Sequence, residues 1–480
     1  MRSYTPFLLG LFMLACWTHG YAQEQIGLRI ENYAGVNSLL LNPAANLSGK
    51  FKWDVNIVAG GLFAENSYAF IGNTNLREIL RNTDNIRAVS EFEGEAQIPT
   101  DVLLLDYFDD NQPMFAEVST LITGPSFMVN LESGHSFGLF FNFRSMVSVP
   151  RIPSELRYYN IENTVTFEQI DIPAFKGAGM VWSEIGLNYA REMLTDNGTA
   201  GFGINLKFLN GYEGFYFNNN TRIQFSQLPD DIVNFSGANL EFGLTRSNSE
   251  GEDVSLQRTG RGVGIDLGFN YTIDLDDENY LWRFGVSILD LGRIRFNESA
   301  EDYLINTNSL ITLDADDYED VDDLQEAINE FSENTLNDPD AALRDGEFDI
   351  WLPGAISLQA DYALVPYVYL NGLLVQRVPF GNVSLSRGNL LAFTPRFEHR
   401  WFSAALPISL YNYSDMRVGA AVRLAFFTIG SENLGSIIGN DNFTGTDLYF
   451  ALRINPFSLG FGNWGGWGTR RGKNVKCYEF

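Results

Sequence analysis

The stretch Arg261-Gly-Val-Gly-Ile-Asp-Leu-Gly-Phe-Asn-Tyr-Thr-Ile-Asp274 alternates apolar side chains with polar or glycine residues. One face carries Val263, Ile265, Leu267, Phe269, Tyr271 and Ile273, and the other carries Gly264, Asp266, Gly268, Asn270 and Thr272. A period of two residues is typical of a β-strand. Strands of soluble sheets favour about five or six residues, whereas a tilted strand that crosses a bilayer needs about nine to eleven. The stretch therefore predicts a membrane-spanning strand.

The same alternation returns along the chain and predicts an all-β fold, an antiparallel transmembrane β-barrel of about 14 strands. Clear candidate strands lie near residues 51–60, 125–132, 135–147, 180–193, 200–210, 261–274, 280–290, 355–364, 366–377, 391–404, 405–413, 416–428 and 446–455. Weaker patterns near 115–123 and 160–170 bring the expected total to about fourteen, because bacterial single-chain barrels have even strand numbers. Short polar turns such as Asp196-Asn-Gly198 predict antiparallel neighbours.

Long polar connections alternate with these short turns, at residues 71–113, 148–178, 211–259 and 291–353. This asymmetry is typical of barrels, whose long loops usually lie outside the cell. Trp282, Trp401 and Tyr411 fall near strand ends, where aromatic rings can rest at the membrane interface. The alternative, a soluble β-sandwich with these rings in its core, would need shorter strands.

The N-terminus has the pattern of a secretory signal peptide over residues 1–22. An early arginine precedes an apolar run over residues 7–17, which is too short for a membrane-spanning helix. Gly20 and Ala22 occupy the small-residue positions of a cleavage site, so we expect the mature chain to start after Ala22. A second interpretation places the cleavage before Cys16, with a lipid attached to that residue.

The composition fits a protein of the outer membrane. Hydrophobic residues make up 45% of the chain, yet they are spread over alternate positions, so the mean hydropathy stays at -0.09. The net charge of -28 argues against nucleic acid as a partner and fits solvated loops on a cell surface. After processing Cys477 has no second cysteine with which to form a disulfide. We expect the protein in the outer membrane of a Gram-negative bacterium, with lipid around its wall.

Several strands place charged residues on the face that would line the lumen: Arg144, Lys207, Asp266, Arg283, Arg417, Arg423 and Arg453. If the arginines gather, they form a positive patch suited to a carboxylate or another anionic ligand. The alternative is that they pair with inward acids such as Asp266 and Glu184 and pack the barrel. The sequence leaves both interpretations open.

Motifs of an enzyme or a metal site are nearly absent. Gly260-Arg-Gly-Val-Gly264 continues into strand alternation instead of opening a helix, which excludes a dinucleotide loop. His135 stands in a turn, and His399 and Glu398 are strand neighbours whose side chains point to opposite faces. We expect no enzymatic activity, no cofactor and no metal; a hydrolase in barrel form, with a triad assembled across strands, is the alternative.

The densest acidic run, at residues 314–323, precedes Leu324, Ile328 and Phe331 at helical spacing. This pattern predicts a short amphipathic helix on a loop. Clustered carboxylates also allow a calcium site, although the glycine and the glutamate of an EF-hand loop are absent from their positions. A solvated, charged loop is the other interpretation.

The segment Ser38-Leu-Leu-Leu-Asn-Pro-Ala-Ala45, just before the first strand, resembles the Asn-Pro-Ala segment of the long-chain fatty-acid transporter (FadL-like) superfamily. It also resembles the related shuttle and anchoring barrels of Bacteroidota type IX protein secretion. Later phrases are similar to the uncharacterised Bacteroidota family DUF5723, namely residues 393–398, 400–409, 430–436 and 445–450. This second resemblance spans most of the mature chain.

The transporter resemblance implies a fourteen-stranded barrel over residues 49–456, with residues 23–48 entering its lumen as a plug. Asn42 and Pro43 would then fix the turn from plug to wall; alternatively, they only initiate a turn before the first strand. Residues 457–480 form a Gly/Trp-rich link and a basic C-terminal tail, which we expect in the periplasm, either disordered or bound to a partner. The closing strand is expected at 447–454, through its lipid-facing stripe.

Two functions remain open at the level of sequence. One is a plugged channel or transporter for small hydrophobic or amphipathic molecules. The other is a non-conducting barrel that anchors a secretion or cell-surface complex through its acidic loops or its tail. A protein partner is therefore expected in the second case and a small hydrophobic or anionic ligand in the first.

Overall fold

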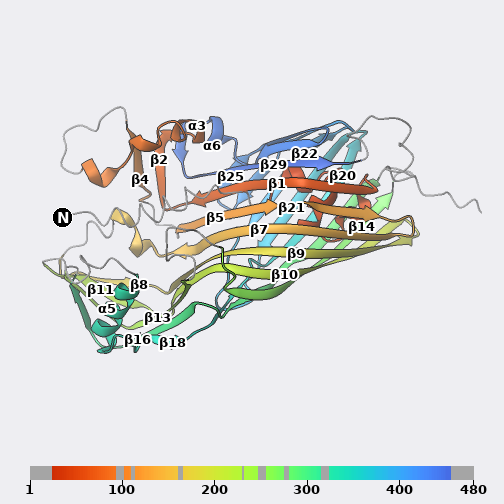
Figure 1. Ribbon diagram of the computed structural model, residues 1–480. Helices are drawn as coiled ribbons and strands as arrows, with labels where there is room; N and C mark the ends of the chain where they lie inside the picture. Colours follow the sequence, from red (N-terminus) through yellow and green to blue (C-terminus); the bar gives the residue numbers. More distant parts are fainter. Residues whose placement is uncertain are drawn as a thin grey trace, which may run out of the picture.

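The computed structural model describes residues 24–92, 102–109, 114–159, 166–229, 232–246, 256–274, 280–314 and 324–455. One antiparallel sheet closes on itself, because β1 (Trp53–Asn66) pairs with β29 (Gly445–Ile454) on one side and with β5 (Met114–Thr123) on the other (Figure 1). In the described part of the chain, no helix is long and apolar enough to span a membrane. The predicted signal peptide at 1–22 and the predicted tail at 457–480 lie outside the described residues.

Fourteen strand positions make the wall, each antiparallel to its neighbours, which confirms the predicted fold class. In order around the barrel they are β1; β5 (Met114–Thr123) continued by β6 (Ser126–Asn130); β7 (His135–Ile152); β9 (Phe175–Thr195); β10 (Gly198–Asn219); β14 (Gly260–Asp274); β15 (Tyr280–Phe296); β20 (Ala355–Val365); β21 (Val368–Arg377); β22 (Leu390–Glu398); β23 (Phe402–Ala405) continued by β24 (Ile408–Tyr411); β25 (Asp415–Val418) continued by β26 (Ala420–Leu424); β27 (Phe427–Ser431); and β29. Closure pairs the two terminal strands of the wall, as a lipid environment requires.

One wall position combines two predicted strands. The patterns at 115–123 and 125–132 appear as β5 and β6, and both pair with β1 on one side and with β7 on the other. Gly124-Pro125 separates them, because proline has no N–H for the hydrogen-bond ladder. The two patterns therefore count as a single strand of the barrel.

Three other strand predictions were wrong in detail. The pattern at 391–404 runs through a turn, because its first part is β22 and its last residues belong to β23, which pairs antiparallel with β22. The pattern at 416–428 covers two wall positions, since the chain reverses near Ala425, whose φ of +53° suits a tight turn, and returns as β27. The pattern at 160–170 gives no wall strand among the described residues. Residues 160–165 lie outside them, and β8 (Gln169–Ile172) belongs to a separate small sheet.

The two faces of β14 meet different surroundings, as its alternation predicts. Val263 and Leu267 are 58% and 43% exposed on the outside of the barrel, whereas Asp266 and Asn270 are buried inside it. Exposed apolar side chains recur around the wall, among them Phe137, Phe141, Ile185, Phe202, Phe208, Phe284, Val286, Leu358, Phe393, Ile429 and Phe450. An outward apolar band of this kind is the surface that a bilayer covers.

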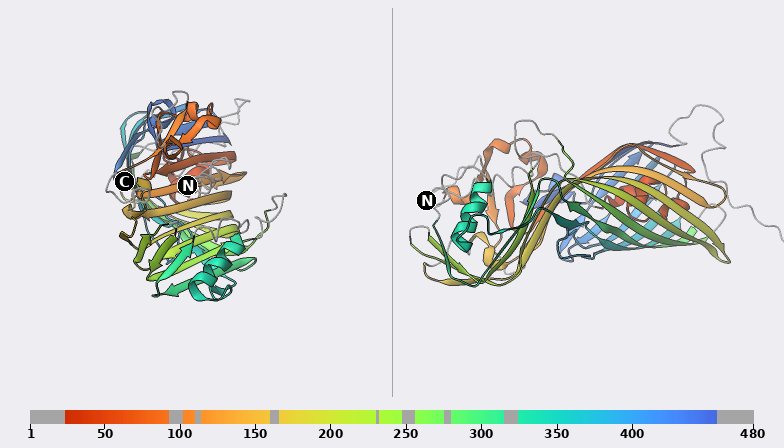
Figure 2. Two further views of the ribbon diagram at one scale, coloured as in Figure 1. Left: turned by 90° about the vertical axis from the view of Figure 1, so that its left-hand side faces the viewer. Right: turned by 60° about the horizontal axis from the view of Figure 1, so that its bottom comes forward.

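The two ends of the barrel differ. At one end short turns join the strands, as between β9 and β10, and β1 begins beside the end of β29, with Val55 opposite Ile454. At the other end the connections are long and build an outer extension (Figures 1 and 2). β9 and β10, with 21 and 22 residues, run from the barrel into this extension. Barrels of the outer membrane have short periplasmic turns and long external loops, so we expect the extension to face outward.

The outer extension contains two small sheets, with the orders β28–β2–β4–β3 and β17–β12–β11–β8. Its elements are β2 (Ala69–Thr74), α3 (Leu76–Ile79), η3 (Thr83–Asn85), β3 (Ile86–Ala88), η4 (Val89–Phe92), β4 (Leu103–Tyr107), η5 (Ser154–Leu156), β8, β11 (Ile223–Gln227), β12 (Ile232–Ser236), β13 (Ala238–Thr245), β16 (Ala300–Thr307), β17 (Ile311–Asp314), α5 (Leu324–Leu336), β18 (Leu343–Asp345), β19 (Phe348–Trp351), α6 (Gly435–Ile438) and β28 (Asp441–Phe443). β13, β16, β18 and β19 continue the sheet of the wall.

The predicted amphipathic helix on the long connection is α5. Ile328 is buried against Tyr303 and Ile305 of β16, and the ring of Phe331 stacks on Phe235 with the ring centroids 6.0 Å apart. The helical spacing of apolar residues therefore identified the face that packs on the extension. Residues 315–323 of the acidic run before the helix lie outside the described residues.

The described chain before β1 lies inside the barrel (Figure 1). This lumen segment, residues 24–48, contains α2 (Ile26–Arg29), η1 (Gly35–Leu40) and η2 (Ala45–Ser48). Leu28 and Leu39 are completely buried there, with 0% exposure, although the segment adds no strand to the sheet. The barrel therefore has a complete wall and a filled lumen.

Candidate functional site

The turn at Asn42 and Pro43 joins the lumen segment to the wall. The side chain of Asn42 accepts a hydrogen bond from Ala44 N at 2.9 Å, which closes the turn, and donates to Phe269 O of β14 at 3.1 Å. Asn188 of β9 donates to Pro43 O at 2.9 Å. The pair thus initiates a turn and also docks it against two strands.

Two wall glycines leave the space for this turn. A Cβ at Gly203 would lie 2.3 Å from Pro43 O, and a Cβ at Gly268 would lie 2.3 Å from Asn42 Oδ1. Any larger residue there would push the lumen segment away from the wall. The sequence analysis placed Gly268 on the polar face of its strand and did not single out Gly203, so it missed the role of both.

Polar side chains of the wall also satisfy the backbone carbonyls of the lumen segment. Asn205 donates to Leu39 O at 2.9 Å, and Ser287 donates to Leu41 O at 2.7 Å. An irregular segment exposes carbonyl groups that a helix or sheet would pair internally, and in an enclosed site each needs a partner. The segment is therefore held by hydrogen bonds from side chains and by apolar packing, as of Leu39 in a cluster with Phe140, rather than by strand pairing.

A first ionic cluster lies in the outer half of the lumen, around Asp290 of β15. The Asp290 carboxylate lies 3.1 Å from Arg144 Nη1 and 2.6 Å from Lys207 Nζ, and it also pairs with Arg387 of the connection after β21. Arg387 Nη1 in turn contacts Glu24 of the lumen segment at 2.9 Å. The cluster links the wall, an outer connection and the lumen segment.

The same cluster contains two further wall carboxylates. Lys207 Nζ lies 2.7 Å from Asp266, and Arg144 Nη1 lies 3.0 Å from Glu184. Glu184 also accepts from Trp182 Nε1 at 2.8 Å. Each cation of the cluster thus faces more than one carboxylate, an arrangement that compensates part of the cost of burying charge.

Other ion pairs lie around the rest of the lumen. Arg283 Nη2 is 2.8 Å from Asp361, and Arg417 Nη2 is 2.8 Å from Glu65. Glu31 of the lumen segment receives Arg423 Nε at 2.9 Å and faces Arg453 Nη2 at 3.5 Å. The two contacts of Glu31 fix the segment to β26 and β29, whereas the other two pairs join wall strands to each other.

All seven predicted lumen charges are enclosed by the barrel and lie within 4 Å of an oppositely charged group, as the pairs Arg144–Glu184, Lys207–Asp266, Arg283–Asp361, Arg417–Glu65, Arg423–Glu31 and Arg453–Glu31 show. In the described structure the arginines of this set thus face carboxylates, and the ion pairs correspond to the second interpretation, pairing with inward acids; binding of an anionic ligand stays a prediction. The sequence did not identify Glu24, Asp290 or Arg387. For Asp290 a signal existed, because the consecutive apolar residues Ile288 and Leu289 break the alternation where the register of β14 and β15 shifts.

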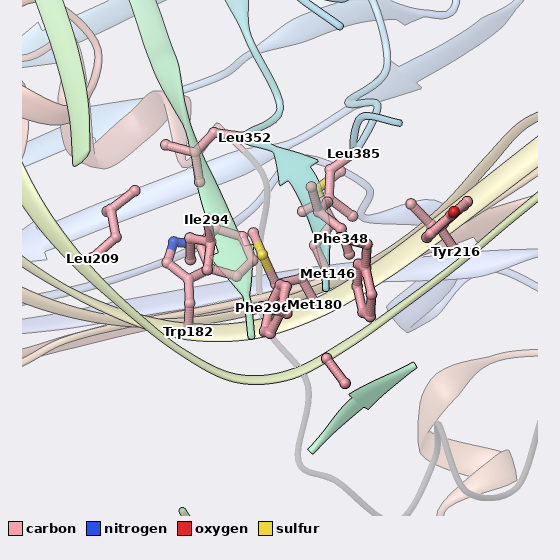
Figure 3. Packing of buried hydrophobic residues seen from close by; sticks show 13 residues of the cluster. Met146, Met180, Trp182, Leu209, Tyr216, Ile294, Phe296, Phe348, Leu352 and Leu385 are labelled. Carbon is pink, nitrogen blue, oxygen red and sulfur yellow. The ribbon is translucent and has the colours of Figure 1, made fainter. Parts of the chain in front are cut away.

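An apolar cluster lies beside the first ionic cluster, toward the outer extension (Figure 3). Met146 and Met180 come from β7 and β9, Phe296 from β15 and Phe348 from β19, and Leu385 comes from the connection that carries Arg387. Trp182 belongs to this cluster as well. Its ring lies 4.8 Å from the guanidinium carbon of Arg144, so one indole joins the apolar and the charged regions.

The space left in the lumen is small. One cavity of about 30 Å³ lies between the lumen segment and the wall, and a second of about 50 Å³ lies at the first ionic cluster. A water molecule needs about 10–15 Å³ by this measure, so each cavity holds a few waters at most. Neither of these two cavities admits a much larger solute in the described part of the chain.

A search of curated proteins finds no match to the chain. Solved structures with similar folds include the P. putida toluene transporter TodX, a TodX deltaS2S3 mutant described as a monoaromatic hydrocarbon channel, and a Pseudomonas aeruginosa FadL homologue. Each is 8% identical; they cover 88%, 88% and 90% of this chain and 93%, 94% and 97% of their own, with TM-scores of 0.39, 0.42 and 0.26. The model of a family of unknown function, DUF5723, matches residues 43–432. Since this match covers most of the chain, the protein belongs to the DUF5723 family, as its motifs predicted.

Proposed function

We propose that the protein is a plugged outer-membrane channel for small amphipathic solutes, closed by its lumen segment. The observation that carries this proposal is the independence of the wall from the segment. β1 and β29 complete the barrel, while residues 24–48 contribute no strand to it. Because the wall is complete without the segment, movement of residues 24–48 out of the lumen would open a pore through the 14-stranded barrel.

Many contacts that hold the lumen segment are ion pairs and hydrogen bonds, which water can replace. Glu24 and Glu31 pair with wall or loop arginines, and carbonyls such as Leu41 O accept from wall side chains. Water can replace each of these hydrogen bonds, and the net stabilisation from one of them is only about 0.5–1.5 kcal/mol, or about 1.5–3 kcal/mol for a charged partner. Displacement of the segment would hydrate these polar groups. It would also expose the apolar side chains of Ile26, Leu28 and Leu39 and the wall residues in their clusters.

The lining supports an amphipathic solute. Asn142, Asn188 and Asn205 face the interior together with the paired charges, whereas Met146 and Trp182 present apolar surface beside them. A solute with a polar and an apolar part matches this lining, because the polar part can exchange hydrogen bonds with the amides while the apolar part contacts the indole. A pure hydrocarbon would leave the amides without partners.

The proposal is tested by measuring ion conductance in planar bilayers, and solute uptake in liposomes, for the whole protein and a variant lacking residues 24–48. We expect steady conductance and faster uptake from the deletion variant. The double variant Glu24→Gln/Glu31→Gln keeps the segment but weakens its ion pairs, so it should open more often than the parent protein. Asp171→Asn, which removes an exposed pair with Arg222 in the outer extension, serves as the control and should leave conductance unchanged.

Folding of each variant is checked by its resistance to protease in the membrane. This control ensures that a lack of conductance in a misfolded variant is not taken as evidence against a channel. A folded deletion variant without conductance or uptake would overturn the channel proposal. That result would instead favour a barrel that serves as a scaffold for other proteins.

A further inference from the structure

We propose that Arg29 is the residue that divides the lumen into two water-filled compartments and so blocks ion passage. This inference rests on the proposed channel function. Arg29 lines the cavity of about 30 Å³ and also the cavity of about 50 Å³. It is buried inside the barrel, with 5% exposure, at the end of α2.

The two cavities lie toward opposite ends of the barrel. Gly49, Asn46 and Asn270 line the smaller one, and Asn270 lies near the end of β14 that joins the short turns. Met146, Trp182 and Arg387 line the larger one, beside the apolar cluster on the side of the outer extension. A path along the barrel axis would pass from one cavity to the other at Arg29.

Both cavities have the polar atoms that hold water. In the smaller cavity, Asn32 Nδ2, Asn46 Oδ1 and Asn371 Oδ1 are buried and have no hydrogen-bond partner within the described structure. In the larger cavity the same is true of Ser119 Oγ. Buried polar groups of this kind are normally satisfied by ordered water when the space admits it, as both volumes do. Arg29 therefore separates two hydrated spaces rather than two parts of an apolar core.

Arg29 is held in place from the outer side. Its Nη1 atom lies 3.5 Å from Glu24, and Glu24 also receives Arg387 Nη1 at 2.9 Å. Arg387 is fixed by Asp290 and by Pro353 O, to which its Nε atom donates at 2.7 Å. Glu24 thus contacts both arginines, so a movement of the outer connection that carries Arg387 would also shift Arg29.

The charge of Arg29 gives a second, independent expectation. Around the larger cavity four cations face four carboxylates: Arg29, Arg144, Lys207 and Arg387, against Glu24, Glu184, Asp266 and Asp290. This group is neutral as a whole. Loss of Arg29 leaves one negative charge in excess, and a path lined in that way favours cations.

The test compares ion flux through Arg29→Ala, Arg29→Met and Arg417→Ala in planar bilayers, with the variant lacking residues 24–48 as the open reference. We expect flux through Arg29→Ala to rise by about tenfold, equivalent to about 1.4 kcal/mol in an open–closed equilibrium, and to select cations. Arg29→Met keeps most of the bulk, so it should stay nearly closed. Arg417→Ala removes another buried arginine that lines neither cavity and should stay closed too.

The outcomes separate this inference from the channel function. If the deletion variant conducts while Arg29→Ala is folded and silent, Arg29 is not the partition, and the channel proposal stands. If Arg29→Met leaks as much as Arg29→Ala, the block comes from the anchoring by Glu24 and not from the side chain in the path, which also overturns the inference. A silent deletion variant refutes the channel function itself.

Discussion

Asp290 is the residue whose substitution we expect to destabilise the barrel most clearly. Its carboxylate lies 3.1 Å from Arg144 Nη1 and 2.6 Å from Lys207 Nζ, and it pairs with Arg387. Asp290→Asn removes the negative charge that these three enclosed cations share. Loss of one partner from a buried ion pair costs about 3–5 kcal/mol, because it leaves an uncompensated charge out of water.

The structure places the expected loss at the lower end of that range. Each of the three cations keeps one other carboxylate, namely Glu184 for Arg144, Asp266 for Lys207 and Glu24 for Arg387. We therefore expect the free energy of unfolding to fall by about 3 kcal/mol. Asparagine isolates this electrostatic effect, because Asp290 has a φ of +57° and asparagine tolerates the left-handed conformation. Alanine at the same position should cost about 1–2 kcal/mol more.

The assay is equilibrium unfolding of the barrel from lipid vesicles in denaturant, followed by tryptophan fluorescence. Asp171→Asn is the control, since its partner Arg222 is 66% exposed and a surface ion pair contributes about 0–1 kcal/mol. If Asp290→Asn and Asp171→Asn lose the same stability within 1 kcal/mol or so, the ionic cluster around Asp290 does not hold the barrel as described.

Three further substitutions test other parts of the structure. Gly203→Ala places a Cβ 2.3 Å from Pro43 O, so we expect a loss of about 1–3 kcal/mol in unfolding and more frequent channel openings; unchanged values would contradict the docking of this turn. Leu267→Arg puts a charge on the lipid face and should cost about 2–4 kcal/mol in refolding into vesicles, whereas a near-zero cost would place that face in water. Burial, with a hydrogen bond to Glu301, raises the pKa of Tyr303 in the outer extension to about 12. The protonated hydroxyl stabilises the fold below pH 10, and this contribution is lost between pH 10 and about 12. In Tyr303→Phe the free energy of unfolding should therefore not fall over this pH range. If it still falls, Tyr303 is not the titrating group.

The wall of the barrel was predictable from sequence because its determinants are local. In β14 the alternation alone separated Leu267, which faces lipid, from Asp266, which faces the lumen. The predicted closing strand at 447–454 is confirmed by β29, whose pairing with β1 closes the barrel. Where local signals failed, a break in the pattern was the reason, as at Gly124-Pro125 and at the turn near Ala425.

The interior was much less predictable, because its contacts join residues far apart in the chain. Ser287 donates to Leu41 O, and Arg453 donates to Tyr33 O at 2.6 Å, across 246 and 420 residues. The lumen segment has no periodicity that would reveal such partners. Arg387 lies on an irregular connection, so no strand pattern marked it as an inward charge. The lumen charges could be named from alternation, but which carboxylate each one meets required the folded barrel.

The ion pairs of the lumen are poor evidence for stability, because well-packed apolar side chains of similar volume stabilise a protein as well or better. A permanently sealed barrel has no need of Glu31 between Arg423 and Arg453, or of Glu24 beside Arg387. A segment that leaves its site does need such contacts, since water re-solvates the separated charges, whereas a separated apolar interface costs about 25 cal/mol per Å² of exposed surface. The polar attachment of the lumen segment lowers the cost of its release, whereas the apolar contacts of Ile26, Leu28 and Leu39 with the wall raise that cost. The proposed channel requires the first contribution to outweigh the second.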